Sequence, residues 1–318
     1  MKRIVGLILL FVMVLTGCNN SKTESNVGKV VNYLSGLGSY SLESKMTIKR
    51  SDKNVSLNVS VDYLSPGYYK VCFKGDSEQL IIKNDNGVFV LTPSLNKEFK
   101  FDSNWPLNSS HAYLLESIKK DIKNDVEATS TLNGTDIVIE CKITHKTNQK
   151  LSKMVYTCDK DFKPKKTVFL NDNNEEIITV DFENFTPNNS LGKDIFNEKK
   201  YLNQQQEQQP NESETSLTIT AGYVVDGSTL SSSLQDNSTS ILCYTGEVPY
   251  TIVVSKVEVS DEVVAIENYD DFEIIDCGLC LISDNSMKFY NKDYEVVIYS
   301  NFLEIDDFIN IANNISMS

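Results

Sequence analysis

The chain has 318 residues with 40% hydrophobic composition, and its 30 basic and 44 acidic side chains give a formal net charge of −14. So acidic a surface repels phosphate backbones, and no cluster of Lys or Arg along the sequence interrupts it, which argues against nucleic-acid binding. The length suffices for a substantial core and allows two domains.

The N-terminus has the pattern of a lipoprotein signal peptide. Two basic residues precede the apolar run Ile4–Leu15, which is shorter than the roughly 20 residues that a membrane-spanning helix needs. The run closes on Leu-Thr-Gly-Cys ending at Cys18, an arrangement in which the cysteine thiol accepts a diacylglycerol. We therefore expect removal of residues 1–17, and anchoring by acyl chains such as palmitate on Cys18 at the extracytoplasmic face of the cell membrane. The alternative is a plain secretory signal with an incidental cysteine.

Removal of residues 1–17 takes away two basic side chains, so the formal net charge becomes −16 from 28 basic and 44 acidic residues. That charge disfavours attraction of the folded body to anionic lipid, which leaves the lipid on Cys18 as the expected membrane contact. Residues 18–26 are interpreted as a polar tether between this lipid and the first domain.

Residues 27–202 are predicted to form the first domain, whose fold class is α+β and mostly antiparallel β. The clearest signal is the alternation of Val55, Leu57, Val59 and Val61 with polar residues, which indicates a strand with one apolar face. Helical periods occur only at Val27–Leu34 and Leu114–Ile122. Turn signals separate the further expected strands, which are Leu42–Lys49, Tyr68–Lys74, Gln79–Lys83, Gly87–Thr92, Asp136–Thr144, Lys153–Asp159, Pro164–Leu170 and Glu176–Phe182.

A change of composition marks the start of a second domain. Residues 203–215 are rich in Gln, Asn and Glu, include Pro210 and offer little to bury, which is typical of a linker. Residues 216–318 are then expected to form a small C-terminal α+β domain.

Six cysteines remain after Cys18, an even number that permits disulfides in an exported protein without fixing their pairing. Cys277-Gly278-Leu279-Cys280 has the spacing of a redox motif, but it lies between strand-like segments with no helical period after it. Buried thiols or a local structural bridge are therefore favoured over redox chemistry.

Catalysis and metal binding have little support in the sequence. His111 and His145 lack metal-ligand spacing to another His, Cys or carboxylate. Ser109 and Ser110, which precede His111, are interpreted as helix-capping residues and not as part of a catalytic triad. Paired carboxylates such as Asp270-Asp271 would point to opposite faces of a strand, as solvated charges do. We therefore expect no catalytic residue, no metal site and no cofactor.

Several segments carry a resemblance to a known family. Tyr63-Leu64-Ser65-Pro66, followed by Glu78–Ile82, Gly87–Pro93 and Leu95-Asn96-Lys97, resembles the LolA-like lipoprotein carriers. Gly87–Leu115, with Ile241–Ile252 and Asp293–Ser300 in the second domain, is similar to the LolA-like sporulation lipoproteins of Gram-positive spore formers. The resemblance implies a half-barrel of roughly eleven strands with helices on its concave face. It also implies a non-catalytic protein that holds acyl chains or a protein partner.

Two functional hypotheses follow from the resemblance, and an enzyme is a third with far less support. The first is a membrane-anchored lipoprotein that binds an envelope protein, such as a cell-wall enzyme, in sporulation or germination. The second is a carrier of lipid or lipoprotein acyl chains. Carriers proper have Arg where this chain has Ser65, and a lipidated Cys18 holds the protein at the membrane, so both features favour the first hypothesis. The expected lining of a hydrophobic cavity is Val55, Leu57, Val59, Val61, Leu80, Ile82, Leu114, Leu115 and Ile118.

Overall fold

The computed structural model describes residues 25–50, 54–75, 78–101, 104–107, 109–143, 151–202, 218–236, 238–257, 264–266, 269 and 271–317. The expected signal peptide (1–17), Cys18, most of the tether and the linker at 203–215 lie outside these residues. None of the described helices is both long and apolar enough to span a membrane.

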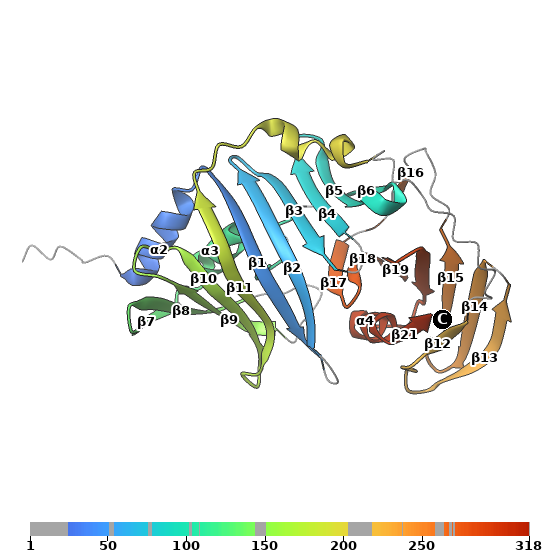
Figure 1. The fold of residues 1–318 in the computed structure, drawn as a ribbon. Helices are drawn as coiled ribbons and strands as arrows, with labels where there is room; N and C mark the ends of the chain where they lie inside the picture. Colours follow the sequence, from blue (N-terminus) through green and yellow to red (C-terminus); the bar gives the residue numbers. More distant parts are fainter. Residues whose placement is uncertain are drawn as a thin grey trace, which may run out of the picture.

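One large curled sheet forms the first part of the molecule (Figure 1). Its twelve strands are ordered β16-β6-β5-β4-β3-β2-β1-β11-β10-β9-β8-β7. The antiparallel half-barrel expected from the sequence is therefore confirmed, with one addition: β16 (Val264–Ile266) comes from the second part of the chain and pairs with β6 in parallel. The other strands are β1 (Ser39–Lys49), β2 (Asn54–Leu64), β3 (Tyr68–Lys74), β4 (Glu78–Asn84), β5 (Gly87–Thr92), β6 (Lys97–Phe101), β7 (Thr129–Asn133), β8 (Asp136–Lys142), β9 (Leu151–Cys158), β10 (Pro164–Asn171) and β11 (Glu176–Pro187).

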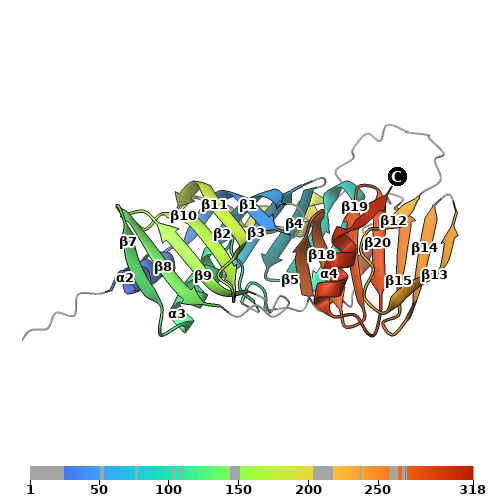
Figure 2. The same ribbon diagram turned by 90° about the horizontal axis from the view of Figure 1, so that it is seen from below.

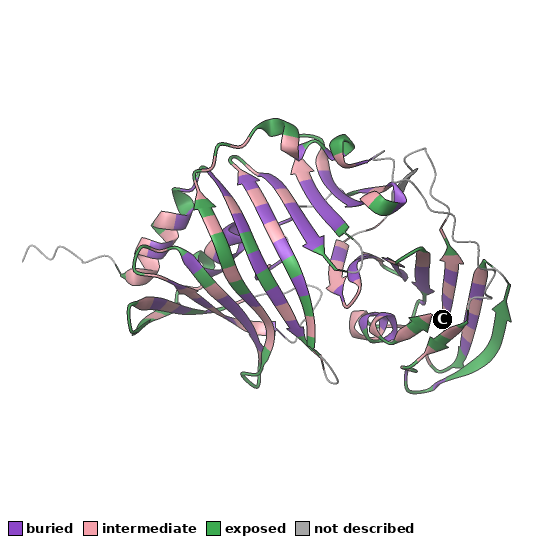
Figure 3. Cartoon of the chain, viewed as in Figure 1, coloured by how far each residue is buried: buried purple, intermediate pink, exposed green. Residues whose placement is uncertain are grey.

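The alternation seen in the sequence sets the two faces of the sheet. Along β2, Leu57, Val59 and Val61 are buried, while the polar residues between them remain exposed or half-buried. Neighbouring strands repeat the pattern, which appears as alternating purple and green bands in Figure 3. One side chain in two therefore points to the concave face, as expected for a sheet covered on one side.

Both expected helices are present, and both pack on the concave face. In α2 (Asn26–Ser35), Val30 and Leu34 join the same core as the concave side of the sheet. In α3 (Leu115–Asn124), that contribution comes from Leu115, Ile118 and Ile122.

The expected capping of α3 by serines is wrong, because its N-cap is Leu114, which makes no side-chain cap hydrogen bond. Ser109 and Ser110 are instead buried beneath the helix. The hydroxyl of Ser117 in the first turn of α3 accepts a hydrogen bond from the backbone N–H of His111 (2.8 Å), which holds the preceding loop against the helix.

A smaller layer covers part of the convex face. The 3₁₀ turns η3 (Lys193–Phe196) and η4 (Glu198–Tyr201) follow β11 and cross behind β3, β4 and β5. Leu202 and Tyr201 close a small outer cluster with side chains from those three strands. This end of the sheet is therefore buried on both faces.

A second sheet follows, with seven strands in the order β13-β14-β15-β20-β19-β18-β17. One of its faces packs on α4 (Ile305–Asn313), and the short strands β12 (Ile219–Ala221) and β21 (Ile315–Met317) pair beside it (Figure 2). Its strands are β13 (Ser228–Gln235), β14 (Thr239–Gly246), β15 (Tyr250–Lys256), β17 (Asp271–Ile275), β18 (Gly278–Ser283), β19 (Ser286–Asn291) and β20 (Tyr294–Tyr299).

The second sheet also contributes to the core of the half-barrel. Along β18, Leu279 and Leu281 belong to the half-barrel core, whereas Cys280 between them belongs to the core beneath α4. Because successive side chains of a strand alternate between faces, β17 to β19 lie between the two cores and serve both.

Candidate functional site

The concave face of the half-barrel holds most of the residues expected to line a cavity. Leu57, Val59 and Val61 from β2 lie in one core with Leu114, Leu115 and Ile118 around the start of α3. All six are buried, and Val55 packs at the margin of the same core. The structure therefore brings these residues together as tightly packed core.

Leu80 and Ile82 do not lie on that face, which corrects the expectation from the sequence. In the β3–β4 ladder, Val71 pairs with Ile81 and Cys72 pairs with Leu80. Val71 and Ile81 belong to the concave core, so the alternate residues Cys72, Leu80 and Ile82 face outward into the convex cluster. The inward residues of β4 are Gln79 and Ile81.

The β17–β18 hairpin occupies the remaining concave space. Phe272 of β17 packs edge-on against Phe101 of the half-barrel, with ring centroids 5.5 Å apart, and lies 6.1 Å from Trp105. Leu279 and Leu281 of β18 are buried in the same core. The hairpin thus fills part of the hollow with side chains from the same chain.

Gln79 fixes the hairpin at its turn. This side chain is only 2% exposed, and its amide donates to the carbonyl of Leu279 and accepts from the backbone N–H of the same residue. Gly278 permits the approach, because a Cβ there would collide with Oε1 of Gln79, and its φ is +137°. The glycine in the Cys-Gly-Leu-Cys segment is thus explained by a close contact between the two sheets.

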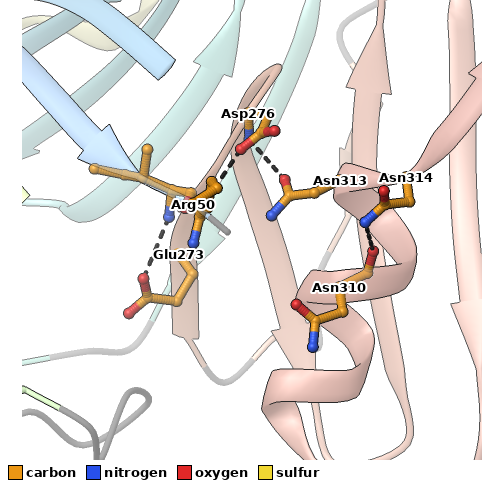
Figure 4. Close-up of polar contacts among 7 residues, drawn as sticks. Arg50, Glu273, Asp276, Asn310, Asn313 and Asn314 are labelled. Carbon is orange, nitrogen blue, oxygen red and sulfur yellow. Dashed lines mark hydrogen bonds and ion pairs between the residues drawn. The ribbon is translucent and has the colours of Figure 1, made fainter. Parts of the chain in front are cut away.

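An ion pair also fixes the hairpin at its turn. Arg50, at the end of β1, donates from Nε to Oδ1 of Asp276 (3.1 Å), and its side chain lies between Asp276 and Glu273 (Figure 4). The backbone N–H of Asp276 donates in turn to the side-chain oxygen of Asn313 in α4 (2.8 Å). This chain of contacts joins the half-barrel, the hairpin and the last helix.

A small cavity remains between the half-barrel mouth and the hairpin, with a volume of about 50 Å³. Its lining is mainly apolar, and polar groups from both sheets lie at its rim. The lining includes Ile48, Arg50, His111, Tyr113, Phe272 and Glu273. For comparison, an apolar cavity of about 150 Å³ holds one benzene molecule.

Two carboxyl groups on α3, those of Glu116 and Asp121, are buried, and burial raises the pKa of each. Burial raises the pKa of Glu116, whose carboxylate accepts a hydrogen bond from the hydroxyl of Tyr40 (2.7 Å). Burial also raises the pKa of Asp121 to about 6, although a hydrogen bond from Ser110 and the nearby Lys120 oppose the shift. Neither group lines the cavity of about 50 Å³. We therefore assign both carboxyl groups to the packing of α3 against its surroundings.

The remaining polar candidates from the sequence are the cysteines, the possible metal ligands and His145. The six cysteines after Cys18 are free thiols, and burial raises the pKa of Cys280 well above its usual range. Within the described ranges, no three His, Cys, Asp or Glu side chains gather as metal ligands. His145 lies outside the described residues.

The sequence interpretation missed Arg50, Gln79 and Gly278, which hold the two sheets together. Arg50 is the only arginine after Arg3, a signal that a specific contact needs a guanidinium group. Gly278 was visible as an isolated glycine in a strand-like run, which often marks a close backbone approach. Gln79 carried no comparable signal.

The architecture defines a two-sheet protein in which a LolA-like half-barrel is filled by helices and by a hairpin from the second sheet. The model of the family described as sporulation protein YdcC-like matches residues 1–196, which is more than half of the chain. The chain belongs to this family. A curated relative, the sporulation protein YdcC of Bacillus subtilis strain 168, is 28% identical over 319 residues, which cover 96% of this chain and 94% of that protein. The expected membership in a family of sporulation proteins is confirmed.

Solved structures show a more distant likeness. MucB in complex with MucA(peri) has a TM-score of 0.34 at 11% identity, covering 92% of this chain and 98% of that one. A DUF1329 family protein from Desulfovibrio piger has a TM-score of 0.35 at 12% identity, covering 57% of this chain and 98% of that one. A LolA superfamily protein from Nitrosomonas europaea has a TM-score of 0.32 at 11% identity, with coverages of 54% and 97%.

Proposed function

We propose that the protein is a non-catalytic lipoprotein, anchored through Cys18 at the extracytoplasmic face of the cell membrane, that acts in sporulation by binding a protein partner. The observation that carries this proposal is the filled concave face of the half-barrel. Among the described residues, helices, the loop before α3 and the β17–β18 hairpin occupy the hollow, and a cavity of about 50 Å³ lies between them. An acyl carrier needs an open hollow, so the geometry favours a fixed platform.

The second sheet offers the platform an exposed edge. Among the described strands, β13 pairs only with β14, and seven of its eight residues are exposed. Its sequence Ser-Thr-Leu-Ser-Ser-Ser-Leu-Gln contains neither a charged residue nor a proline, two devices that keep a sheet edge from pairing, although its register with β14 shifts between Leu230 and Ser232. Leu230 and Leu234 on this strand are 53% and 64% exposed.

The partner that fits this edge is an extended segment of another polypeptide, added as one more strand. Exposed carboxylates stand at both ends of β13, with Asp226 and Glu247 beside its start and Asp236 after its end. A partner segment with a neutral or apolar centre and basic flanks complements that charge pattern.

Gatekeeper substitutions on β13 test the partner site. Leu230→Lys with Leu234→Lys places two charges on the exposed edge, and we expect wild-type thermal stability but a heat-resistant spore yield near that of a deletion strain. Leu107→Lys is the matched control, because Leu107 is an exposed leucine on the half-barrel. A normal spore yield from the double variant would overturn the β13 assignment.

The anchor and the acyl-carrier alternative need their own measurements. Cys18→Ala should move the protein from the membrane to the soluble fraction or leave an unprocessed precursor, since acylation needs the thiol. Native mass spectrometry of the soluble protein should show no co-purified acyl chain. Bound acyl chains at a stoichiometry near one per protein would instead support a carrier.

A further inference from the structure

On the helix pair α2 and α3, the charged side chains that are at least partly exposed are basic, although the chain as a whole has a net charge of −14. The two acidic residues of α3, Glu116 and Asp121, are buried, whereas Lys119, Lys120 and Lys123 lie at least partly in solvent. Lys29 is half-exposed on α2, which contains no acidic residue. The outer face of this helix pair is therefore basic.

Two acidic side chains, Asp125 and Glu127, lie just beyond the end of α3, and within the described part of the chain only Glu127 of the two forms an ion pair. The carboxylate of Asp125 accepts hydrogen bonds from the backbone N–H groups of Glu127 and Lys142. Glu127 forms an ion pair with Lys142. Lys120 also donates to the carbonyl of Ser109 (3.1 Å), so Lys29, Lys119 and Lys123 contribute most to the outward positive charge.

Exposed apolar side chains lie beside this basic face. Val126, in the turn after α3, is 97% exposed, and Leu132 on the edge strand β7 is 67% exposed. The helix α2 contacts both α3 and β7. In Figures 1 and 2, α2, α3 and β7 gather at one end of the molecule, and β13 lies at the opposite end.

The chain enters the fold at this basic end. Ser25, the residue that caps α2, comes only seven positions after Cys18. Fully extended, that stretch spans at most about 25 Å. If Cys18 carries the lipid, as proposed above, the start of α2 is held within that distance of the bilayer.

We propose that the outer face of α2 and α3, together with Val126 and Leu132, rests on an anionic bilayer surface. Lysines near an anionic leaflet are attracted to it, and an exposed valine or leucine adds shallow insertion between headgroups. This orientation rests on the proposed anchor and extends it, because it directs β13 away from the membrane. The acidic remainder of the surface is repelled by the same lipids.

Depth measurements on an artificially anchored protein test the proposal. The mature chain from Asn19 onward, with an N-terminal histidine tag, is bound through nickel-chelating lipids to vesicles of phosphatidylglycerol or of phosphatidylcholine. In a background with Cys243→Ser and Cys277→Ser, which removes the two partly exposed thiols, a fluorophore is attached at Val126→Cys or at Leu234→Cys, and quenching by spin-labelled lipids is measured. We expect quenching at residue 126 on phosphatidylglycerol to exceed that at residue 234 at least threefold, and to fall on phosphatidylcholine or in high salt.

A charge-reversal pair identifies the surface responsible. Lys119→Glu with Lys123→Glu should abolish the quenching at residue 126, whereas Lys45→Glu with Lys49→Glu, the same charge change on the exposed face of β1, should leave it intact. Equal quenching at residues 126 and 234, or equal effects of the two pairs, would overturn the proposal. Because the chelating lipid replaces Cys18, the outcome is independent of whether that cysteine is acylated, which the Cys18→Ala fractionation decides separately.

Discussion

The two sheets differ in how much of their surface is covered by the rest of the chain. The twelve-stranded sheet buries its concave face against helices, a loop and a hairpin, and part of its convex face against η3 and η4. The seven-stranded sheet is covered where β17 to β19 meet the half-barrel, but its other end terminates in the exposed strand β13. The first sheet is therefore the more fully covered, and β13 of the second sheet is a longer exposed edge strand than β7 of the first.

This contrast bears on whether the half-barrel of this protein can accept a ligand. A hollow that is open to solvent can accept cargo, whereas a hollow filled by its own chain is a core. Arg50, Gln79 and Gly278 hold the filling hairpin in place through contacts between the two sheets. The following substitutions test how tightly the concave face is packed and how strongly the hairpin is held against it.

The largest expected effect is that of truncating the concave core. Leu57→Ala should lower the free energy of unfolding by about 2 to 5 kcal/mol, because Leu57 is buried and its removal leaves a void. Leu234→Ala on β13 is the control and should change it by less than about 0.5 kcal/mol. Urea titrations of both variants measure the difference. Similar small losses in both would show that the concave face is loosely packed and open to ligand.

A pH effect of the next size is expected from Asp121. Burial raises its pKa in the folded protein to about 6, above the value in the unfolded chain, so the folded state binds the proton more tightly. Stability should therefore be higher near pH 4 and decline as pH rises to about 6, with a total of about 3 kcal/mol since one pKa unit is about 1.4 kcal/mol.

Substitution of Asp121 isolates this contribution. Asp121→Asn should flatten the decline between pH 4 and pH 6, as measured by urea titrations at several pH values. Asp125→Asn is a useful control, because hydrogen bonds from the Lys142 and Glu127 backbone lower the pKa of Asp125 and give the opposite sign. Parallel profiles for Asp121→Asn and the parent would contradict the assignment.

A smaller effect is expected where the hairpin turn meets Gln79. Gly278→Ala should cost about 1 to 3 kcal/mol, because the new methyl group displaces the Gln79 amide and the backbone has a positive φ. Gly134→Ala also changes a glycine with positive φ, but it has no atom within 4 Å and should cost less. Thermal melts compare the two, and Gln79→Ala combined with Gly278→Ala should recover part of the loss. Equal costs for both glycines would remove the close contact as the cause.

The smallest effect is expected from the partly exposed ion pair between Arg50 and Asp276. Arg50→Gln should cost about 1 kcal/mol or less at low salt, with the difference from the parent shrinking at about 1 M salt as screening weakens the pair. Lys153→Gln, which removes an ion pair with Glu140 within the half-barrel, is the control. Melting curves with an apolar dye provide the readout, and only Arg50→Gln should increase dye uptake by loosening the hairpin.

The sequence predicts the local elements well where one face of a strand is clearly apolar. The expected bounds of β3 and β5 coincide with the observed ones, and β2 has the expected inward residues. Strands β6 and β7 were missed because they are short and largely polar. The face of β4 was misassigned because Leu80, Ile81 and Ile82 are all apolar, so only pairing with β3 decides which points inward.

The filling of the hollow could not be predicted from local pattern, because it depends on contacts between residues far apart. Gln79 and Leu279 are separated by 200 residues, and neither is unusual in its own segment. The basic face of α3 was hidden for a related reason: only the fold shows that Glu116 and Asp121 turn inward while the lysines do not.

The position of the hairpin in the sequence also sets the order in which the core can be completed. The half-barrel strands β1 to β11 are complete by residue 187, but the side chains that finish their core come from β17 to β19, as far along as Tyr290. Because the chain emerges from its N-terminus, the concave surface stays uncovered until residues 271–290 have followed. Contacts of such high sequence separation form late, so a chain that is truncated before the hairpin presents exposed apolar surface to chaperones and proteases.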